Sequence, residues 1–199
     1  MSAVLAAPPV CLLSHRPDRS PVLTLIPPWC NCSPGSVERS ITGLPVAGRW
    51  PDIAGQVKAH DVAVSHHVAY NVGEIEDFLL SLNARARRRV VLEVTPIHPQ
   101  ATLNNLWQHL HGLQRPQTPT ADDLVAVLRE LGLAPHGEPT RRPAPPTPQP
   151  RDLLVSFPRR RLCLDHTADS EIGRLLPADF SAPPPEVVCI WWDSDSRIG

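Results

Sequence analysis

The chain has 199 residues, a formal net charge of -1 at pH 7 and 25 prolines. That length allows one domain with a sizeable hydrophobic core. The nearly balanced charge and the scattered basic residues argue against a nucleic-acid partner, and no apolar run is long enough to cross a membrane. The first apolar run is broken by prolines and has no basic residues before it, which argues against a signal peptide. We therefore expect a cytoplasmic protein.

Proline divides the sequence into regions. It concentrates in the first 50 residues and again from Pro135 to Pro150, and leaves the central segments nearly free of it. Because proline interrupts both helices and central strands, we expect residues 1–42 to be irregular, with Val22–Ile26 as their best strand candidate. Residues 43–199 are expected to form an α/β domain that contains a proline-rich loop at 138–150.

The centre of the chain has the pattern of a strand, a helix and a second strand within about 35 residues. The strands are predicted at 61–65 and 90–94, two short apolar runs rich in β-branched residues. The helix between them is predicted to have Asn71 as its N-cap and to carry one apolar stripe, formed by Ile75, Phe78, Leu79 and Leu82. This order predicts a βαβ unit with parallel strands and a right-handed crossover.

Further elements are predicted on both sides of this unit. A short strand and a turn precede it at 44–52. Helices are predicted at 101–110, 120–131 and 169–176, and strands at 153–157, 161–164 and 186–192. Two late strands would add an antiparallel edge to a parallel sheet. We therefore predict an α/β fold whose sheet is mostly parallel with an antiparallel C-terminal edge.

Polar side chains follow both strands of the central unit. Ser65, His66 and His67 leave the first strand, and Thr95 and His98 follow the second. Parallel strands bring their carboxyl ends to one edge of the sheet, where ligands of open α/β sheets bind. We therefore expect the candidate site at this edge.

The histidines of that edge are candidates for acid–base chemistry. An imidazole titrates near neutral pH, so His66 or His67 can serve as a general base. Adjacent strand residues point to opposite faces, which predicts that only one of the two faces the site. Tyr70 and His98 are expected to orient a substrate. The alternative is that the two histidines only hydrogen-bond loop backbone or line a pocket.

A family resemblance rests on three segments in this order: residues 48–52 (GRWPD), residues 61–72 (DVAVSHHVAYNV), and residues 88–96 with the helices and strands after them. With these segments, the stretch from Gly43 to Trp192 resembles the class I S-adenosylmethionine-dependent methyltransferases, in particular the methyltransferase-11/12 type. The resemblance implies a Rossmann-like methyltransferase sheet, S-adenosyl-L-methionine as cofactor, and methyl transfer to a small-molecule acceptor that is selected by variable loops.

The resemblance also implies roles for individual residues. Those expected to line the cofactor are Gly48, Arg49, Trp50, Ser65 and His66. His66 or His67 would be the base, and Tyr70 and His98 would bind the substrate. From the residues alone, Gly48 and Trp50 suit either a close approach of a ligand to the backbone beside a flat ring, or a ring that only covers a loop.

One departure from the family concerns the N-terminal region. The family's glycine-rich turn, which lets the cofactor approach the backbone, has no counterpart in residues 1–45, where the only glycines are Gly35 and Gly43. The abundance of Pro, Cys, Arg and Ser there is what a shifted reading frame of GC-rich DNA gives. We hypothesise that the first half was lost or mistranslated, which would leave the sheet incomplete at its N-terminus. A glycine-rich motif in an adjacent frame of the locus would support this, and its absence from every frame would refute it.

Two other functional classes stay open. The missing glycine-rich turn suits a methyltransferase remnant that neither binds cofactor nor catalyses. The close spacing of His66, His67, His98, His109 and His111 suggests a metal-dependent hydrolase. The hydrolase is the weaker hypothesis, since the usual carboxylate or His-x-x-x-His spacing of a zinc site is absent.

Overall fold

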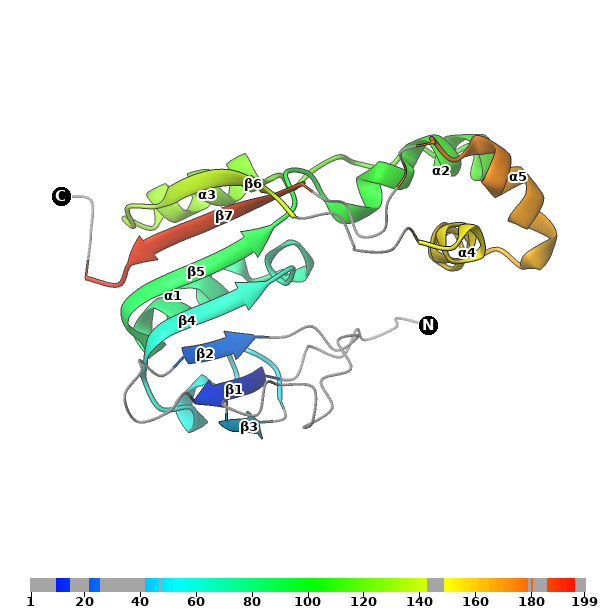
Figure 1. Ribbon diagram of the computed structural model, residues 1–199. Helices are drawn as coiled ribbons and strands as arrows, with labels where there is room; N and C mark the ends of the chain where they lie inside the picture. The colour runs from blue at the N-terminus through cyan, green and yellow to red at the C-terminus, as the bar shows by residue number, and fades with distance from the viewer. Residues whose placement is uncertain are drawn as a thin grey trace. The chain divides into compact units, whose positions relative to one another are not determined.

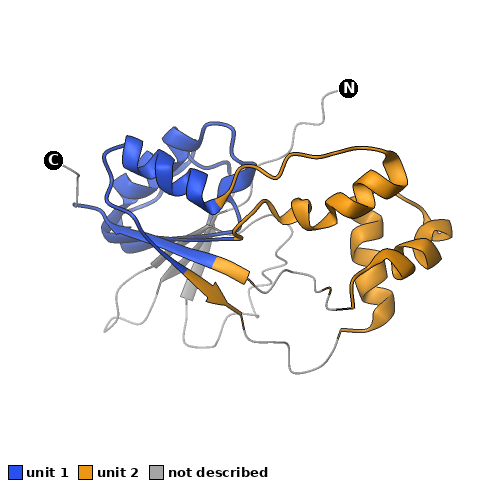
Figure 2. Ribbon diagram, turned by 90° about the horizontal axis from the view of Figure 1, so that it is seen from above, with its two compact units in different colours: residues 1–94, 121–138, 188–199 blue, residues 95–120, 139–187 orange. Residues whose placement is uncertain are grey.

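The computed structural model describes residues 10–14, 22–25, 42–46, 48–142, 149–178, 180 and 186–195. In the first three strands only the backbone is described, apart from Val46. The chain divides into two compact units (Figures 1 and 2). The first comprises residues 1–94, 121–138 and 188–199, and the second comprises residues 95–120 and 139–187.

A seven-stranded sheet organises the first unit. The strand order is β3-β1-β2-β4-β5-β7-β6 (Figure 1). The strands are β1 (Val10–Ser14), β2 (Val22–Leu25), β3 (Thr42–Val46), β4 (His60–His66), β5 (Ala86–Val94), β6 (His136–Arg141) and β7 (Glu186–Asp193). β2, β4 and β5 are parallel neighbours, whereas β7 is antiparallel to β5. The predicted α/β class is confirmed, and the sheet is mixed: β1 pairs antiparallel with β2 and β3, and β7, next to the edge strand β6, pairs antiparallel with β5.

The central βαβ unit is confirmed. β4 and β5 pair in parallel, with Ser65 opposite Leu92 and His66 opposite Glu93. Helix α1 (Ile75–Arg85) connects them and buries three residues of its predicted stripe, Phe78, Leu79 and Leu82, at 1 % exposure or less. Together with α3 (Ala121–Glu130) it contributes to a single core, in which Trp192 of β7 donates from Nε1 to Asn83 Oδ1 at 2.8 Å.

The boundaries of α1 differ from the prediction at both ends. Asn71 lies in a 3-10 turn (Ala69–Asn71), and Glu74 holds the N-cap position without a side-chain hydrogen bond. The predicted capping by Asn71 is therefore wrong. At the other end β5 begins at Ala86, four residues before the strand predicted at 90–94, so Arg87 and Arg89 lie in the strand. There they pair across the sheet, Arg87 with Asp61 at 3.3 Å and Arg89 with Asp193 at 2.8 Å.

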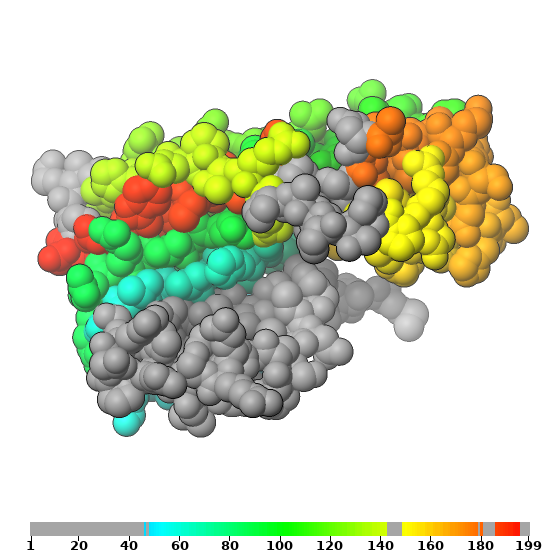
Figure 3. All heavy atoms as spheres, in the orientation of Figure 1, coloured from blue at the N-terminus to red at the C-terminus, as the bar shows by residue number. Residues whose placement is uncertain are grey.

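The two faces of the sheet have different surroundings. On β4, β5 and β7 the residues that face α1 and α3 are buried, whereas the alternate residues, among them Val64, Val91 and Trp191, are half-exposed. Side chains of these strands lie open to view in Figure 3. His66 and Glu93 belong to this second set, so they project from the open face of the sheet.

The last strands were only partly predicted. The strand at 186–192 is confirmed as β7. β6 occupies the start of the segment expected to be a proline-rich loop, and its residues are all exposed. A strand without a buried face has no alternating apolar pattern, which is why it was missed. Residues 143–148 of that loop lie outside the described residues.

The second unit is helical and has its own core. Its helices are α2 (Asn104–His111), α4 (Arg151–Arg161) and α5 (Asp169–Leu175), preceded by 3-10 turns at Pro99–Leu103 and His166–Ala168. The predicted helices 101–110 and 169–176 are thus confirmed, and the first ends at Gly112, which has a φ of +67°. The buried residues of this core are Leu103, Leu106, Val155, Leu162, Ile172 and Leu176.

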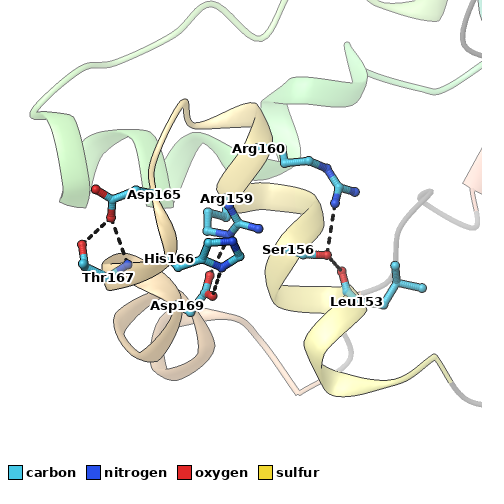
Figure 4. A network of polar contacts seen from close by, with 8 residues as sticks. All are labelled: Leu153, Ser156, Arg159, Arg160, Asp165, His166, Thr167 and Asp169. Atoms are coloured by element: carbon cyan, nitrogen blue, oxygen red, sulfur yellow. Dashed lines mark hydrogen bonds and ion pairs between the residues drawn. The ribbon is translucent and has the colours of Figure 1, made fainter.

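The strands predicted at 153–157 and 161–164 are wrong, because α4 occupies most of this region. Val155 and Leu162 are buried at helical spacing against Ile172 of α5. A short apolar run does not by itself distinguish a strand from a buried helix. Ion pairs also join this region: the Asp169 carboxylate lies 2.8 Å from Arg159 Nε and 3.0 Å from His166 Nδ1 (Figure 4).

The N-terminal expectations are tested only in part. β2 coincides with the strand candidate at 22–26, and β1 pairs antiparallel with both β2 and β3. The boundary at 42/43 and the irregularity of residues 1–42 stay predictions, since most of that segment lies outside the described residues. Across the described ranges, no helix combines the length and apolar character that a bilayer crossing requires.

Candidate functional site

The carboxyl ends of β4 and β5 bring a carboxylate beside two histidines. Glu93 lies opposite His66 in the parallel pairing. Its Oε1 is 3.4 Å from His66 Nδ1 and 3.2 Å from His67 Nε2. The Glu93 and His67 side chains are each 23 % exposed, whereas His66 is 47 % exposed. The carboxylate therefore lies between a half-buried and an exposed imidazole.

His67 connects Glu93 to a phenol. Its Nδ1 is 2.5 Å from the hydroxyl of Tyr70, which lies in the 3-10 turn after β4, and the two rings stack at 6.3 Å between centroids. The backbone N–H of His67 also donates to Glu93 O at 2.8 Å. Glu93, His67 and Tyr70 thus form a continuous polar series, called here the Glu93–His67–Tyr70 relay.

The direction of the hydrogen bonds in the relay follows from its chemistry. An ionised carboxylate only accepts, so a neutral His67 carries its proton on Nε2 and donates it to Glu93. Nδ1 is then an acceptor, and the Tyr70 hydroxyl donates to it. The phenol oxygen keeps acceptor capacity for a further hydroxyl or amine. A proton taken up by Tyr70 can pass to His67, where Glu93 stabilises the resulting positive charge.

The backbone of His67 is strained. Its φ is +55°, in the left-handed region that costs a non-glycine residue about 1–2 kcal/mol. Strained residues of this kind often cluster at functional sites. The bond from His67 N to Glu93 O and the two side-chain contacts hold His67 in this conformation.

Ser65 is buried beside this edge, at 2 % exposure. It lies in β4 opposite Leu25 of β2 and Leu92 of β5. Its Oγ has no hydrogen-bond partner among the described residues. A buried hydroxyl without a partner is costly, so this oxygen is a candidate for a contact with a ligand.

Gly48 and Trp50, which were expected to line a cofactor, have packing contacts instead. Gly48 has a φ of +157°, and a Cβ there would lie 2.2 Å from Ile53 Cγ2. Trp50 is 4 % exposed in the core, and its Nε1 donates to Phe78 O at 3.4 Å. These contacts account for both residues without a ligand. Arg49, between them, is exposed.

His98 belongs to the second unit. It precedes the 3-10 turn at 99–103, and its Nδ1 accepts from Gln100 N at 3.2 Å. Burial lowers the pKa of His98, and the positive charges of Arg115 and Arg161 lower it further. Its expected place in one site with His67 stays a prediction.

The remaining histidines of the hydrolase hypothesis have separate partners. His109 Nε2 is 3.0 Å from Glu171 Oε1, and His111 Nε2 is 2.9 Å from the carbonyl oxygen of Leu162. Within the described ranges, no group of three or more His, Cys, Asp or Glu residues is arranged to hold a metal ion.

Glu93 is the site residue that the sequence analysis missed. It is the single charged residue in the apolar run 90–94 (VVLEV). A carboxylate inside an otherwise apolar strand was a usable signal, because the strand next to it ends in two histidines. Finding it required the register, which places His66 opposite Glu93.

Comparisons with known proteins give structural neighbours only. No family model matches the chain. No curated protein matches it either. A solved structure similar to this chain is magnesium protoporphyrin IX methyltransferase from Synechocystis PCC 6803 with bound S-adenosylhomocysteine. The identity is 12 %, the match covers 71 % of this chain and 48 % of that one, and the TM-score is 0.38.

Two other neighbours are the YcgJ protein of Bacillus subtilis and the plantazolicin methyltransferase BpumL with S-adenosylhomocysteine. The first is 12 % identical over 71 % of this chain and 66 % of that one, with a TM-score of 0.38. The second is 10 % identical over 69 % and 53 %, with a TM-score of 0.33. The chain thus spans about half of the length of the two methyltransferases named. At these TM-scores the fold class rests on the strand order and directions, which make the chain an open-sheet α/β protein.

Proposed function

We propose that this chain binds S-adenosyl-L-methionine at the carboxyl edge of β4 and β5 and transfers its methyl group to a small-molecule acceptor. The observation that carries the proposal is the Glu93–His67–Tyr70 relay at that edge. Ligands of open α/β sheets bind beyond the carboxyl ends of the strands, and a relay that takes up a proton suits an acceptor that must lose one.

The residues present fit such a cofactor in part. Ser65 Oγ is a buried polar atom without a partner in the described residues, and a polar group of a ligand at this edge would supply one. His66 and Arg49 are exposed and are kept as proposed contacts. Gly48 and Trp50 do not fit this role, because Ile53 and the core fill the space beside them.

The cofactor supplies an electrophilic methyl group on a sulfonium sulfur. An acceptor oxygen or nitrogen that took this methyl group would have to lose its proton. Tyr70 takes this proton on its oxygen while its own proton passes to Nδ1 of His67. Glu93 stabilises the imidazolium. The main contribution of such a site is alignment, to which a rigid relay contributes by fixing the position of the phenol.

The two adjacent histidines have different proposed roles. His67 is the base, because both of its ring nitrogens are engaged in the relay. Among the described residues His66 contacts the carboxylate, at 3.4 Å, and we propose that it helps to orient Glu93 and faces the ligand.

One sequence feature favours a second candidate, a protein of methyltransferase ancestry that binds no cofactor. Residues 1–45 contain no glycine-rich turn. In the family that turn lets the methionine part of the cofactor approach the backbone closely, and a chain without the turn lacks this contact.

Calorimetric titration with S-adenosylhomocysteine decides between the two candidates, after circular dichroism has shown that the protein is folded. We expect micromolar binding, and Ser65→Ala should weaken it by about 5-fold to 30-fold through loss of one hydrogen bond. Ser81→Ala is the matched control, since the Ser81 hydroxyl already has a partner and donates to Phe78 O at 2.9 Å. Without ligand, Ser65→Ala should not lower the free energy of unfolding. A folded wild-type protein that gives no heat of binding would establish the second candidate.

A further inference from the structure

A pocket with several polar side chains in its lining lies within the second unit. It has a volume of about 120 Å³ and is lined chiefly by His98, Gln100, Asn104, Arg115 and Thr118. This volume holds several water molecules and therefore also a compact group of a few heavy atoms. The relay of the proposed function uses none of these residues.

Arg115 gives the pocket its charge. No carboxylate lies among the residues that line the pocket, and none pairs with Arg115 in the part of the chain that the structure describes. The guanidinium lies 4.9 Å from the centroid of the Trp107 ring and donates from Nη1 to Gln100 Oε1. Its positive charge is thus oriented by neutral groups and not cancelled by an anion of the protein.

The backbone around Arg115 is also held in place. Asn104, at the start of α2, donates from Nδ2 to the carbonyl oxygen of Arg115 at 3.1 Å. The stacking on Trp107 and this bond fix both ends of the arginine, so little conformational entropy remains to be lost when a ligand binds.

A second arginine adds to the positive charge around His98. The positive charges of Arg115 and Arg161 add to burial in lowering its pKa. Two guanidinium groups therefore make the surroundings of His98 electropositive, which is the condition that attracts an anion.

We propose that this pocket binds the oxyanion group of a small molecule, a carboxylate or a phosphate, with Arg115 as its charge partner. The planar fork of donors of arginine matches both kinds of oxyanion. The inference does not rest on the proposed methyl transfer, because it concerns residues of the second unit alone.

The test is titration of the full chain with inorganic phosphate and, separately, with sodium benzoate, at low chloride concentration. Binding is measured by calorimetry and by the NMR resonances of the His98 imidazole. Binding of phosphate, benzoate or both is expected, and the two arms show which kind of oxyanion the pocket takes. Bound anion should shift the His98 resonances. Arg115→Met should weaken binding at least about tenfold, whereas Arg160→Met, which removes an exposed arginine outside the pocket, should leave it unchanged.

A second variant guards against misfolding of Arg115→Met. Gln100→Glu keeps the shape of the side chain that already accepts from Arg115, but it adds a carboxylate that neutralises the guanidinium. Gln100→Glu should also weaken anion binding at least about tenfold. Failure of both anions to bind the wild-type protein, or equal binding by wild type and Gln100→Glu, would overturn the proposal. Binding of S-adenosylhomocysteine, measured on the same variants, separates this failure from that of the proposed function.

Discussion

The two units place histidines in opposite electrostatic surroundings. In the first unit His67 lies 3.2 Å from the carboxylate of Glu93, which stabilises an imidazolium. In the second, His98 is partly buried near Arg115 and Arg161, which oppose one. The comparison shows that the charges beside a histidine decide its role. A carboxylate favours the protonated imidazole, whereas two arginines oppose its protonation and make its surroundings attractive to an anion.

Replacement of His67 is the strongest way to break this comparison. We expect His67→Gly to lower the rate of S-adenosylhomocysteine formation, with an acceptor found by screening small hydroxyl and amine compounds, by about 10²-fold to 10⁴-fold. Glycine adopts a positive φ freely, so the relief of strain offsets part of the lost contacts and the protein stays folded. His136→Ala, which removes an exposed histidine of the same unit outside the relay, is the control and should leave the rate unchanged. Equal losses in both variants would remove His67 from its role as base.

Mutations in the two cores test whether the units are distinct. Leu82 of α1 is fully buried in the first core, and Leu103 is 1 % exposed in the second. Each change to alanine should cost about 2–5 kcal/mol in the free energy of unfolding of its own unit. Amide hydrogen exchange should show Leu82→Ala lowering protection chiefly in α1 and β5, and Leu103→Ala chiefly in α2 and α4. A uniform loss in both variants would contradict the division.

Neutralising Glu93 sharpens the comparison further. Glu93→Gln keeps the size of the side chain but removes the charge that stabilises a protonated His67. We expect the rate to fall by about 10-fold to 100-fold, with less effect on affinity for S-adenosylhomocysteine. Glu76→Gln, an exposed carboxylate in the first turn of α1, is a matched control. An unchanged rate for Glu93→Gln would mean that the carboxylate takes no part.

The smallest expected effect concerns pH. The pKa of His98 in the folded protein is lowered from its ordinary value of 6.5, so the unfolded chain binds a proton first as the pH falls. The free energy of unfolding should therefore decrease as the pH falls through 6.5 and below. His98→Asn, whose side-chain oxygen can still accept from Gln100 N, should reduce the difference in stability between pH 7.5 and pH 5 measured by denaturant titration. A difference identical to that of the wild type would contradict this assignment.

The sequence predicted the parts of the fold with regular patterns. The stripe Phe78, Leu79 and Leu82 identified α1, and the β-branched runs identified β4 and β5. β6 was missed because it has no buried face. α4 was wrongly predicted as strands because its apolar run is short. Its helical spacing becomes visible only when the residues that pack against α5 are known.

The candidate site was predicted where its residues follow one another in the sequence, and missed where they come together through tertiary contacts. His66, His67 and Tyr70 follow β4 directly, so their proximity was readable from one segment. Glu93 depended on the register of two strands, and the packing of Gly48 against Ile53 depended on a positive φ that the sequence does not encode visibly. Local patterns thus identify which residues leave a strand, whereas tertiary contacts decide which of them meet.

The most direct test of the proposed function observes the histidines while S-adenosylhomocysteine is added. In ¹⁵N-histidine-labelled protein, with His67→Asn used to assign the signal, we predict that the His67 imidazole resonances shift in proportion to bound ligand. His136, which stacks on Trp191 in the same unit, should not respond. Saturation of the protein with ligand without any change at His67, or shifts at His136 alone, would contradict the placing of the methyl-transfer site at the carboxyl edge of β4 and β5.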